Sequence, residues 1–353
     1  MLDQIRTTLA EIAQSYRDTR IYYCRLDVMA LEGDRCVLGG TVLDSEALAV
    51  VADGLAARFP QITFDITGVE VLRAAVPPRL KAATNVTGLH AQPSFQSEMV
   101  NQLLNGWTVE LLKEEDRWAF VSLPDHAGKG RGYLGWAYRP YLTDSPVAGP
   151  THIVCEPVSL LRAAPTPNAP LVSRIAGGTA VHATVDGDWA RLELAGGLTG
   201  WAPAADLRSL AALPTDEAGR RAQIVQDAAR FIGVPYLWGG CTALGIDCSG
   251  FAQMLHRLIG VTIPRDADMQ HDAGVPVEPP FCPGDLVFFG ESGEERKITH
   301  VGVSLGGWRI IHSSRSRNGV YEDDVQAVNH LRAGFIGART LLSGVQAYVT
   351  GLP

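Results

Sequence analysis

The stretch Asp247–Leu258, DCSGFAQMLHRL, decides how the C-terminal part of this chain folds. Asp247 is a preferred residue for the position just before a helix, because its carboxylate accepts free backbone N–H groups. The apolar residues that follow recur at intervals of three and one, which is the stripe of an amphipathic helix: Phe251, Met254, Leu255, Leu258 and Ile259. Gly260 provides the stop. We therefore predict a helix over 248–258 with Cys248 in its first turn.

A cysteine in the first turn of a helix is a candidate nucleophile. The helix dipole and the free N–H groups there favour a thiolate over a thiol. The nucleophile needs a base. His300 begins a predicted strand, Thr299–Leu305, and His312 ends the next one, Trp308–His312. A hairpin of this length brings both imidazoles to one end of a sheet, where one activates Cys248 and the other orients it.

The composition narrows the class of protein. The chain has 353 residues, with 30 Lys and Arg against 38 Asp and Glu, hence a formal charge of −8. Hydrophobic residues make up 46%, which excludes a disordered protein. The lack of a basic excess argues against a general nucleic-acid partner. The 37 glycines and 21 prolines favour many turns and short strands.

We expect no membrane partner, metal or cofactor. The richest apolar stretch, Ala47–Ala57, contains Asp53 and is too short to span a bilayer. The six cysteines form no C-x-x-C pair and no Cys/His cluster with zinc spacing, so those other than Cys248 are interpreted as small buried side chains. The N-terminus lacks a basic region followed by an apolar core, so we expect a cytoplasmic protein, unless an export signal has been removed. The oligomeric state stays open.

Four domains are predicted along the chain. Residues 1–75 follow the pattern of a small α+β domain, BON-like in outline, and are expected to contain the following elements: helices Leu2–Tyr16 and Ser45–Phe59, and strands Cys36–Leu43 and Gln61–Leu72. Residues 79–145 and 150–210 share the pattern G-x-x-V, a tryptophan and G-W over a similar length. This internal repeat indicates duplicated modules, and it resembles bacterial SH3-like (SH3b) β-barrels. Residues 215–353 carry the candidate chemistry.

Five segments of the last domain together resemble the NlpC-type, papain-like cysteine peptidases of the bacterial cell wall: 235–240 (PYLWGG), 247–251 (DCSGF), 283–286 (PGDL), 300–302 (HVG) and His312. The resemblance implies a papain-like α+β catalytic domain. It implies Cys248 as nucleophile, His300 as base and His312 as the orienting third member. It also implies that Tyr236 lies near the site and assists the oxyanion together with the backbone N–H of Cys248.

With two SH3-like modules in front, the chain resembles the γ-D-glutamyl-L-diamino acid endopeptidases that recycle murein peptides. This resemblance implies a free N-terminal L-Ala, whose ammonium is held by Glu98, Tyr133 and Asp266, with Ser249 also in contact with substrate. The plain alternatives are a Glu98 that is exposed or a helix partner for Gln102, a Tyr133 packed in a strand and an Asp266 that caps a helix. Ala267 departs from the pattern, since some members have serine there.

The predicted function is hydrolysis of the γ-D-Glu–diamino acid bond in short peptides such as L-Ala-γ-D-Glu-diaminopimelate. Two rivals remain. One is a secreted hydrolase of intact peptidoglycan whose SH3-like modules bind the wall. The other is a catalytically dead binding protein on the same scaffold, which the presence of Cys248, His300 and His312 together disfavours. Arg315 and Arg317 are interpreted as a solvated loop rather than as partners of substrate carboxylates.

Overall fold

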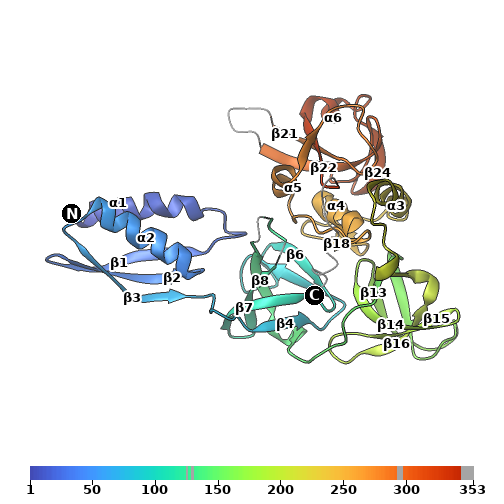
Figure 1. Cartoon of the computed structure of the whole chain (residues 1–353), viewed down its shortest axis with the longest axis horizontal. Coiled ribbons are helices and arrows are strands. Elements are labelled where there is room, and N and C mark those ends of the chain that lie inside the picture. Colours follow the sequence, from blue (N-terminus) through green and yellow to red (C-terminus); the bar gives the residue numbers. More distant parts are fainter. Residues whose placement is uncertain (125, 129–130, 292–296, 343–353) are drawn as a thin grey trace.

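The computed structural model describes residues 1–124, 126–128, 131–291 and 297–342. Figure 1 shows the N-terminal part as a lobe beside the first of two seven-stranded sheets, with the C-terminal part above both of these sheets. No helix in the described ranges is long and apolar enough to cross a bilayer. The chain has a mixed α+β architecture, as predicted.

The N-terminal part is a three-stranded sheet, in the order β1-β2-β3, with two helices. Its elements are α1 (Leu2–Ala13), β1 (Cys24–Glu32), β2 (Arg35–Val42), α2 (Ser45–Arg58) and β3 (Thr63–Val71). Asp44 caps α2, because its Oδ1 accepts the N–H of Ala47 at 2.9 Å. The sequence analysis missed β1. Val28 is its only fully buried residue, and its apolar alternation is confined to Cys24, Leu26 and Val28, so the strand signal is short and weak.

The two middle modules have the same topology. The first contains β4 (Arg79–Ala82), β5 (Val86–His90), β6 (Met99–Leu104), β7 (Thr108–Glu115), β8 (Trp118–Leu123), β9 (Tyr133–Tyr138) and β10 (Leu142–Thr143). The second contains β11 (His152–Val154), β12 (Val158–Arg162), β13 (Leu171–Ala176), β14 (Ala180–Asp186), β15 (Trp189–Glu193), β16 (Thr199–Pro203) and β17 (Leu207–Ser209). Counted from one to seven within each module, the strand order is 7-1-4-5-6-2-3 in both.

This shared order is what a duplicated module produces. In each sheet the third and seventh strands stand at the two ends, and among the described residues no pairing joins them. The sheets are therefore open at this level of description. The SH3-like barrel and the four domain boundaries stay predictions.

The C-terminal part packs helices on a six-stranded antiparallel sheet of order β20-β25-β21-β22-β23-β24. Its helices are α3 (Glu217–Ala229), α4 (Cys248–Arg257), α5 (Ala267–Ala273) and α6 (Asn329–Gly334). Its strands are the hairpin β18 (Cys241–Thr242) and β19 (Gly245–Ile246), then β20 (Val275–Val277), β21 (Leu286–Glu291), β22 (Lys297–Gly306), β23 (Arg309–Ser314), β24 (Gly319–Asp324) and β25 (Phe335–Thr340). Every residue of α4 is buried.

Apolar contacts and hydrogen bonds join the four parts of the chain. Leu43 and Leu72 of the N-terminal part join a core cluster with Trp118, Phe120 and Trp136 of the first module. The two modules are linked by Asn105, whose side chain exchanges hydrogen bonds with the backbone of Ala195. The first module meets the C-terminal part where Gln102 accepts the N–H of Cys241 at 2.9 Å. The first module therefore contacts all three other parts of the chain and meets the C-terminal part at β18.

All six cysteines are free thiols. Cys36, Cys155, Cys241 and Cys248 are buried, and Cys24 is half-buried. The interpretation of every remaining cysteine as a buried side chain is wrong for Cys282, which is exposed. Cys282 directly precedes the Pro283-Gly284 turn into β21, which explains its access to solvent.

Candidate active site

The start of α4 is fixed by Asp247, as the sequence predicts. Its Oδ1 accepts the N–H of Gly250 at 2.7 Å, and its Oδ2 accepts the N–H of Gly239 at 2.9 Å. One carboxylate thus ties the helix to the loop that precedes β18. The helix and loop approach so closely that a Cβ at Gly250 would lie 2.2 Å from the carbonyl oxygen of Gly240. This contact is the physical reason for glycine three residues after Asp247.

Arg265 holds Asp247 from the other side. Its two terminal nitrogens donate to the two carboxylate oxygens of Asp247, at 3.0 and 2.6 Å. Its Nε donates to Asn101 of β6 at 2.8 Å, and one nitrogen reaches the hydroxyl of Ser249 at 3.0 Å. The Arg265 side chain is only 1% exposed. A buried bidentate pair of this kind locks the first turn of α4 to the first module.

Cys248 is buried in this first turn. The backbone N–H groups of Val301 and Ser249 hydrogen-bond its sulfur and lower the thiol pKa. Burial and the nearby charge of Asp247 outweigh them and raise the pKa of Cys248 to about 12. The expectation that the helix N-terminus favours a thiolate is therefore wrong for the free protein. Desolvation, which disfavours the charged form, exceeds the stabilisation by the N–H groups.

His300 and His312 are joined by a hydrogen bond of 2.6 Å between Nε2 of His300 and Nδ1 of His312. Nε2 of His312 lies 2.9 Å from Oδ2 of Asp323. A carboxylate only accepts, so the His312 proton is on Nε2. Nδ1 of His312 is then an acceptor, and Nε2 of His300 carries the proton donated to it. This leaves the lone pair of His300 on Nδ1, where a base needs it.

Both imidazoles are neutral in this chain of hydrogen bonds. Burial and the adjacent His312 lower the pKa of His300 to about 3. Burial also lowers the pKa of His312, against the opposing effect of Asp323. His300 directly precedes Val301, whose N–H faces the Cys248 sulfur. The free site thus holds a neutral thiol beside a strand that carries a neutral imidazole.

Sequence reasoning missed Asp323. The pairing of the two strands could have predicted this contact. His312 pairs with Tyr321 across β23 and β24, so Asp323 is a diagonal neighbour of His312 on the same face of the sheet. Arg317 donates to the other carboxylate oxygen of Asp323 at 2.8 Å and stacks on the ring of Tyr321 at 4.2 Å. Arg317 therefore helps to hold Asp323, a role that its interpretation as part of a solvated loop did not include.

Tyr236 lies close enough to Cys248 and Asp247 for their charges to affect the pKa of its hydroxyl. Burial and the charges of Cys248 and Asp247 raise the pKa of the Tyr236 hydroxyl, so it remains a protonated donor. Arg315 is exposed and lowers the pKa of Tyr236. In the described part of the chain Arg315 forms no ion pair.

Asp266 meets Tyr133, as the resemblance implied for these two residues, and also an unexpected partner. The Tyr133 hydroxyl donates to Oδ2 of Asp266 at 3.0 Å. Arg20, from the N-terminal part, donates to the same oxygen at 2.8 Å. Arg20 also bonds Asp268 and Asp18, at 2.7 and 2.8 Å. Asp266 occupies the position before α5 but makes no side-chain cap, so the capping alternative is wrong.

Glu98 and Ser249 bond partners other than Asp266, Tyr133 and Arg20. Glu98 is exposed and accepts the indole N–H of Trp238 at 2.7 Å, so it bonds to the loop before β18. Ser249 is buried, and its hydroxyl bonds Asp247 and Arg265. Tyr133 is also buried, with a hydroxyl engaged by Asp266. The structure thus places Ser249 in the support of α4. The substrate roles of all these residues stay predictions.

Residues 233–339 match the model of the NlpC/P60 family. This part of the chain is an NlpC/P60 domain. The match includes Cys248, His300, His312 and Asp323. In the described ranges, no group of three or more His, Cys, Asp or Glu side chains is arranged to hold a metal ion.

The NlpC/P60 domain has curated relatives. A γ-D-glutamyl-L-lysine dipeptidyl-peptidase of Bacillus subtilis is 40% identical over 104 residues, which are 29% of this chain and 35% of the relative. The chain therefore spans about a third of the length of that relative. A dipeptidyl-peptidase 6 of Lysinibacillus sphaericus is 28% identical over 250 residues, which are 67% of this chain and 87% of the relative.

The fold of the NlpC/P60 domain with its modules also occurs in a crystal structure of an NlpC/P60 family protein from Bacillus cereus ATCC 10987. That structure superposes with a TM-score of 0.67 at 22% identity. The match covers 75% of this chain and 99% of the other. A quarter of this chain therefore has no counterpart there.

Proposed function

We propose that this chain is a cysteine endopeptidase that hydrolyses the γ-D-Glu–diamino acid bond of short murein peptides. The observation that carries the proposal is the hydrogen-bond chain from Asp323 through His312 to His300, beside the helix whose first turn holds Cys248. The names of the relatives, γ-D-glutamyl-L-lysine dipeptidyl-peptidase and dipeptidyl-peptidase 6, support this substrate class.

In the proposed mechanism, proton transfer accompanies the attack, because the thiol and imidazole start neutral. Nδ1 of His300 takes the thiol proton of Cys248 while the sulfur bonds to the γ-carbonyl carbon. The oxyanion is held by the backbone N–H of Cys248 and the hydroxyl of Tyr236. His312 and Asp323 stabilise the positive charge that develops on His300.

The tetrahedral intermediate then collapses. His300 returns its proton to the leaving amine of the diamino acid, the C–N bond breaks and a thioester remains on Cys248. Water, deprotonated by Nδ1 of His300, attacks the thioester. The C–S bond breaks, the thiol regains its proton, and L-Ala-γ-D-Glu leaves with a free γ-carboxylate. These steps need neither an oxidant nor a metal ion.

The cluster at Asp266 would bind the ammonium of the N-terminal L-Ala. Three carboxylates, Asp18, Asp266 and Asp268, surround the single guanidinium of Arg20, so the cluster keeps an excess of negative charge. The other oxygen of Asp266, Oδ1, lies 4.0 Å from Arg265 and makes no hydrogen bond to any residue that the structure describes. It offers an acceptor to an ammonium while Tyr133 and Arg20 hold Oδ2.

A second candidate function is hydrolysis of intact peptidoglycan, where the L-Ala nitrogen is an amide. The contact between Arg20 and Asp266 favours this candidate, because a cation already neutralises part of the expected ammonium site. We propose the first function because the acidic excess around Arg20 remains. With this function we also propose a cytoplasmic role in murein-peptide recycling.

The test is hydrolysis of L-Ala-γ-D-Glu-diaminopimelate, with and without N-acetylation, followed by liquid chromatography. We expect turnover of the free amine, at least tenfold weaker turnover of the acetylated peptide, and none with Cys248→Ala. Equal turnover of both peptides would reject the ammonium site and leave the peptidase in place. Absence of turnover by the wild-type protein would reject the peptidase. Sedimentation with sacculi and release of wall fragments would support the second candidate.

A further inference from the structure

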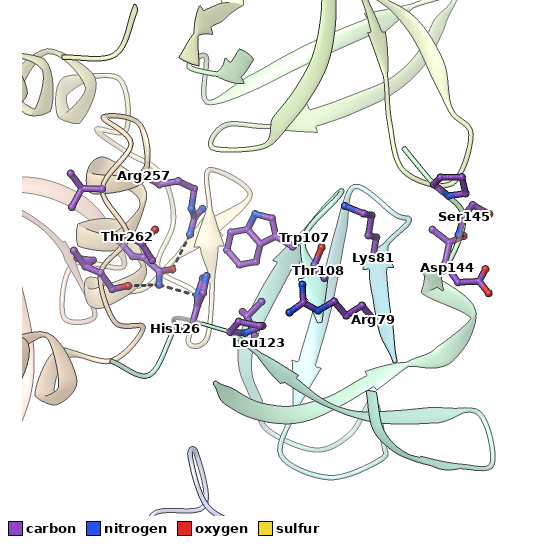
Figure 2. Close-up of a pocket in the computed structure, with 16 residues that line it drawn as sticks. Arg79, Lys81, Trp107, Thr108, Leu123, His126, Asp144, Ser145, Arg257 and Thr262 are labelled. Carbon is purple, nitrogen blue, oxygen red and sulfur yellow. Dashed lines mark hydrogen bonds between the residues drawn. The ribbon is translucent and has the colours of Figure 1, made fainter. Parts of the chain in front are cut away.

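A cavity of about 550 Å³ lies between the first module and the NlpC/P60 domain (Figure 2). It is lined by residues of β4, by Trp107 and by the C-terminal half of α4. Arg257, at the end of α4, is nine residues from Cys248, which corresponds to about 14 Å along the helix. The cavity has the volume of a pocket that binds a small molecule. Nothing in the proposed mechanism uses it.

Arg257 is a buried cation without a carboxylate partner in the described part of the chain. One of its terminal nitrogens donates to Oε1 of Gln253 at 2.9 Å, and the other has no oxygen or nitrogen partner among the described residues, with only the neutral Cys241 thiol nearby. The guanidinium stacks over the ring of Trp107 at 4.3 Å. Burial lowers the pKa of Arg257 to about 10. An anion in the cavity would offset this uncompensated charge.

His126 presents a second hydrogen-bond donor. The amide nitrogen of Gln253 donates to the carbonyl of Ile263 at 3.1 Å, which fixes the orientation of the amide. The same nitrogen lies 3.1 Å from Nδ1 of His126, which must therefore accept (Figure 2). Burial and Arg257 hold the pKa of His126 well below its usual value, so the ring is neutral. Its one proton is then on Nε2.

Two more cations come from the opposite wall. Lys81 and Arg79 stand two positions apart on β4, so their side chains share one face of the strand. Figure 2 shows them on the far side of Trp107 from Arg257. Among the described residues neither forms an ion pair. Burial lowers the pKa of Lys81. Asp144 is the only acidic side chain in the described lining.

We propose that this cavity is a second binding site, separate from Cys248, for a small organic anion with two negatively charged groups. One group would pair with Lys81 and Arg79, and the other would face Arg257 and His126. The apolar body of the ligand would lie against Trp107. Dicarboxylates and phosphate monoesters share this chemistry, and the site is independent of the peptidase proposal.

Isothermal titration calorimetry tests the site, with glutarate and phenyl phosphate as probes of the two sources. We expect saturable one-to-one binding of at least one probe, which weakens as NaCl is raised. Binding should persist after Cys248 is alkylated with iodoacetamide. Binding of glutarate alone assigns dicarboxylates, and binding of phenyl phosphate alone assigns phosphate esters. Absence of saturable binding by both probes would overturn the proposal.

Variants locate the binding. Lys81→Met lies on a half-exposed strand position, and we expect at least a tenfold rise in Kd. Arg257→Met should act in the same direction, and thermal unfolding checks that it folds. The matched control is Arg174→Gln, an exposed arginine on β13 outside the cavity, which should leave Kd unchanged. Equal affinity of Lys81→Met and the wild-type protein for both probes would overturn the assignment to this cavity.

Discussion

Asp323 determines which nitrogen of each imidazole carries a proton. Its Oδ2 accepts from Nε2 of His312, and this choice passes through Nδ1 of His312 to His300. A single carboxylate on β24 thereby sets the lone pair of the base two side chains away. Its own position is secured by Arg317. The orienting unit of this site is therefore a pair, His312 and Asp323, rather than one histidine.

We expect Asp323→Asn to lower kcat by about 10- to 100-fold with little change in KM. The neutral amide no longer stabilises the charge that develops on His300, and it can donate as well as accept. Steady-state kinetics with the murein peptide measure this. Asp324→Asn is the control, because the Asp324 side chain is exposed and, among the described residues, bonds only the N–H of Gln326. An unchanged kcat in Asp323→Asn would remove Asp323 from the mechanism.

The raised pKa of Cys248 predicts how the free protein reacts with iodoacetamide. Below a thiol pKa of about 12 the thiolate fraction grows about tenfold per pH unit, so alkylation should accelerate by that factor from pH 6 to 9. Mass spectrometry of the peptide containing Cys248 measures the rate, in a Cys282→Ser background that removes the exposed thiol. A rate that is already constant near pH 7 would instead indicate a thiolate–imidazolium pair.

Residue-level prediction succeeds where the determinants are local. The role of Asp247 as a cap follows from three neighbouring residues, and the approach of His300 to His312 follows from a hairpin. The contact between Asp323 and His312 could also have been predicted, from the pairing of β23 with β24. The burial that raises the Cys248 pKa comes from strands and modules distant in sequence, so the helix dipole alone gave the wrong sign.

At the scale of elements, α4 depends on Arg265 for its position. Arg265→Met leaves the Asp247 carboxylate buried without its partner, and we expect a loss of about 3–5 kcal/mol in the free energy of unfolding. Adding Asp247→Asn should recover part of this loss, because asparagine still caps a helix and carries no charge. Urea unfolding followed by circular dichroism measures the cycle.

The control for this cycle is Arg309→Met, which breaks an exposed ion pair with Glu322 and should cost less than about 1 kcal/mol. Equal losses in Arg309→Met and Arg265→Met would refute the proposed locking role. Arg265 was not singled out from sequence, because its partners Asn101 and Asp247 are far apart in the chain. The role of Arg265 in positioning α4 depends on the contact between β6 and α4.

For the whole molecule, the decisive contact is that of Arg20 with Asp266. We expect Arg20→Met to lower KM for the free-amine peptide about two- to fivefold, as removal of a competing, partly exposed charge worth roughly 0.5–1 kcal/mol would do. KM for the N-acetylated peptide should not change. Arg6→Met, in the same N-terminal part but paired with Asp27, is the control. Equal shifts for both peptides would show that Asp266 does not select the ammonium.

The architecture was predictable in outline because the determinants are periodic patterns and repeats. The duplicated modules share one strand order, and helix α4 begins at the predicted cap, Asp247. Two kinds of feature escaped. Strand β1 is half exposed, and its apolar alternation covers only its first five residues, which is a weak signal. The bond between Arg20 and Asp266 joins residues 246 positions apart, and no local pattern reveals it.

The linear order of the parts has a consequence for synthesis on the ribosome. Each of the first three sheets is built from one contiguous stretch, so each can complete its strand pairing as it emerges. Arg20, Asn101 and Gln102 are then already in place when Cys248 is translated. The nucleophile is thus added to walls that already exist, and a nascent chain exposes its reactive helix only after the surfaces that will enclose it have folded.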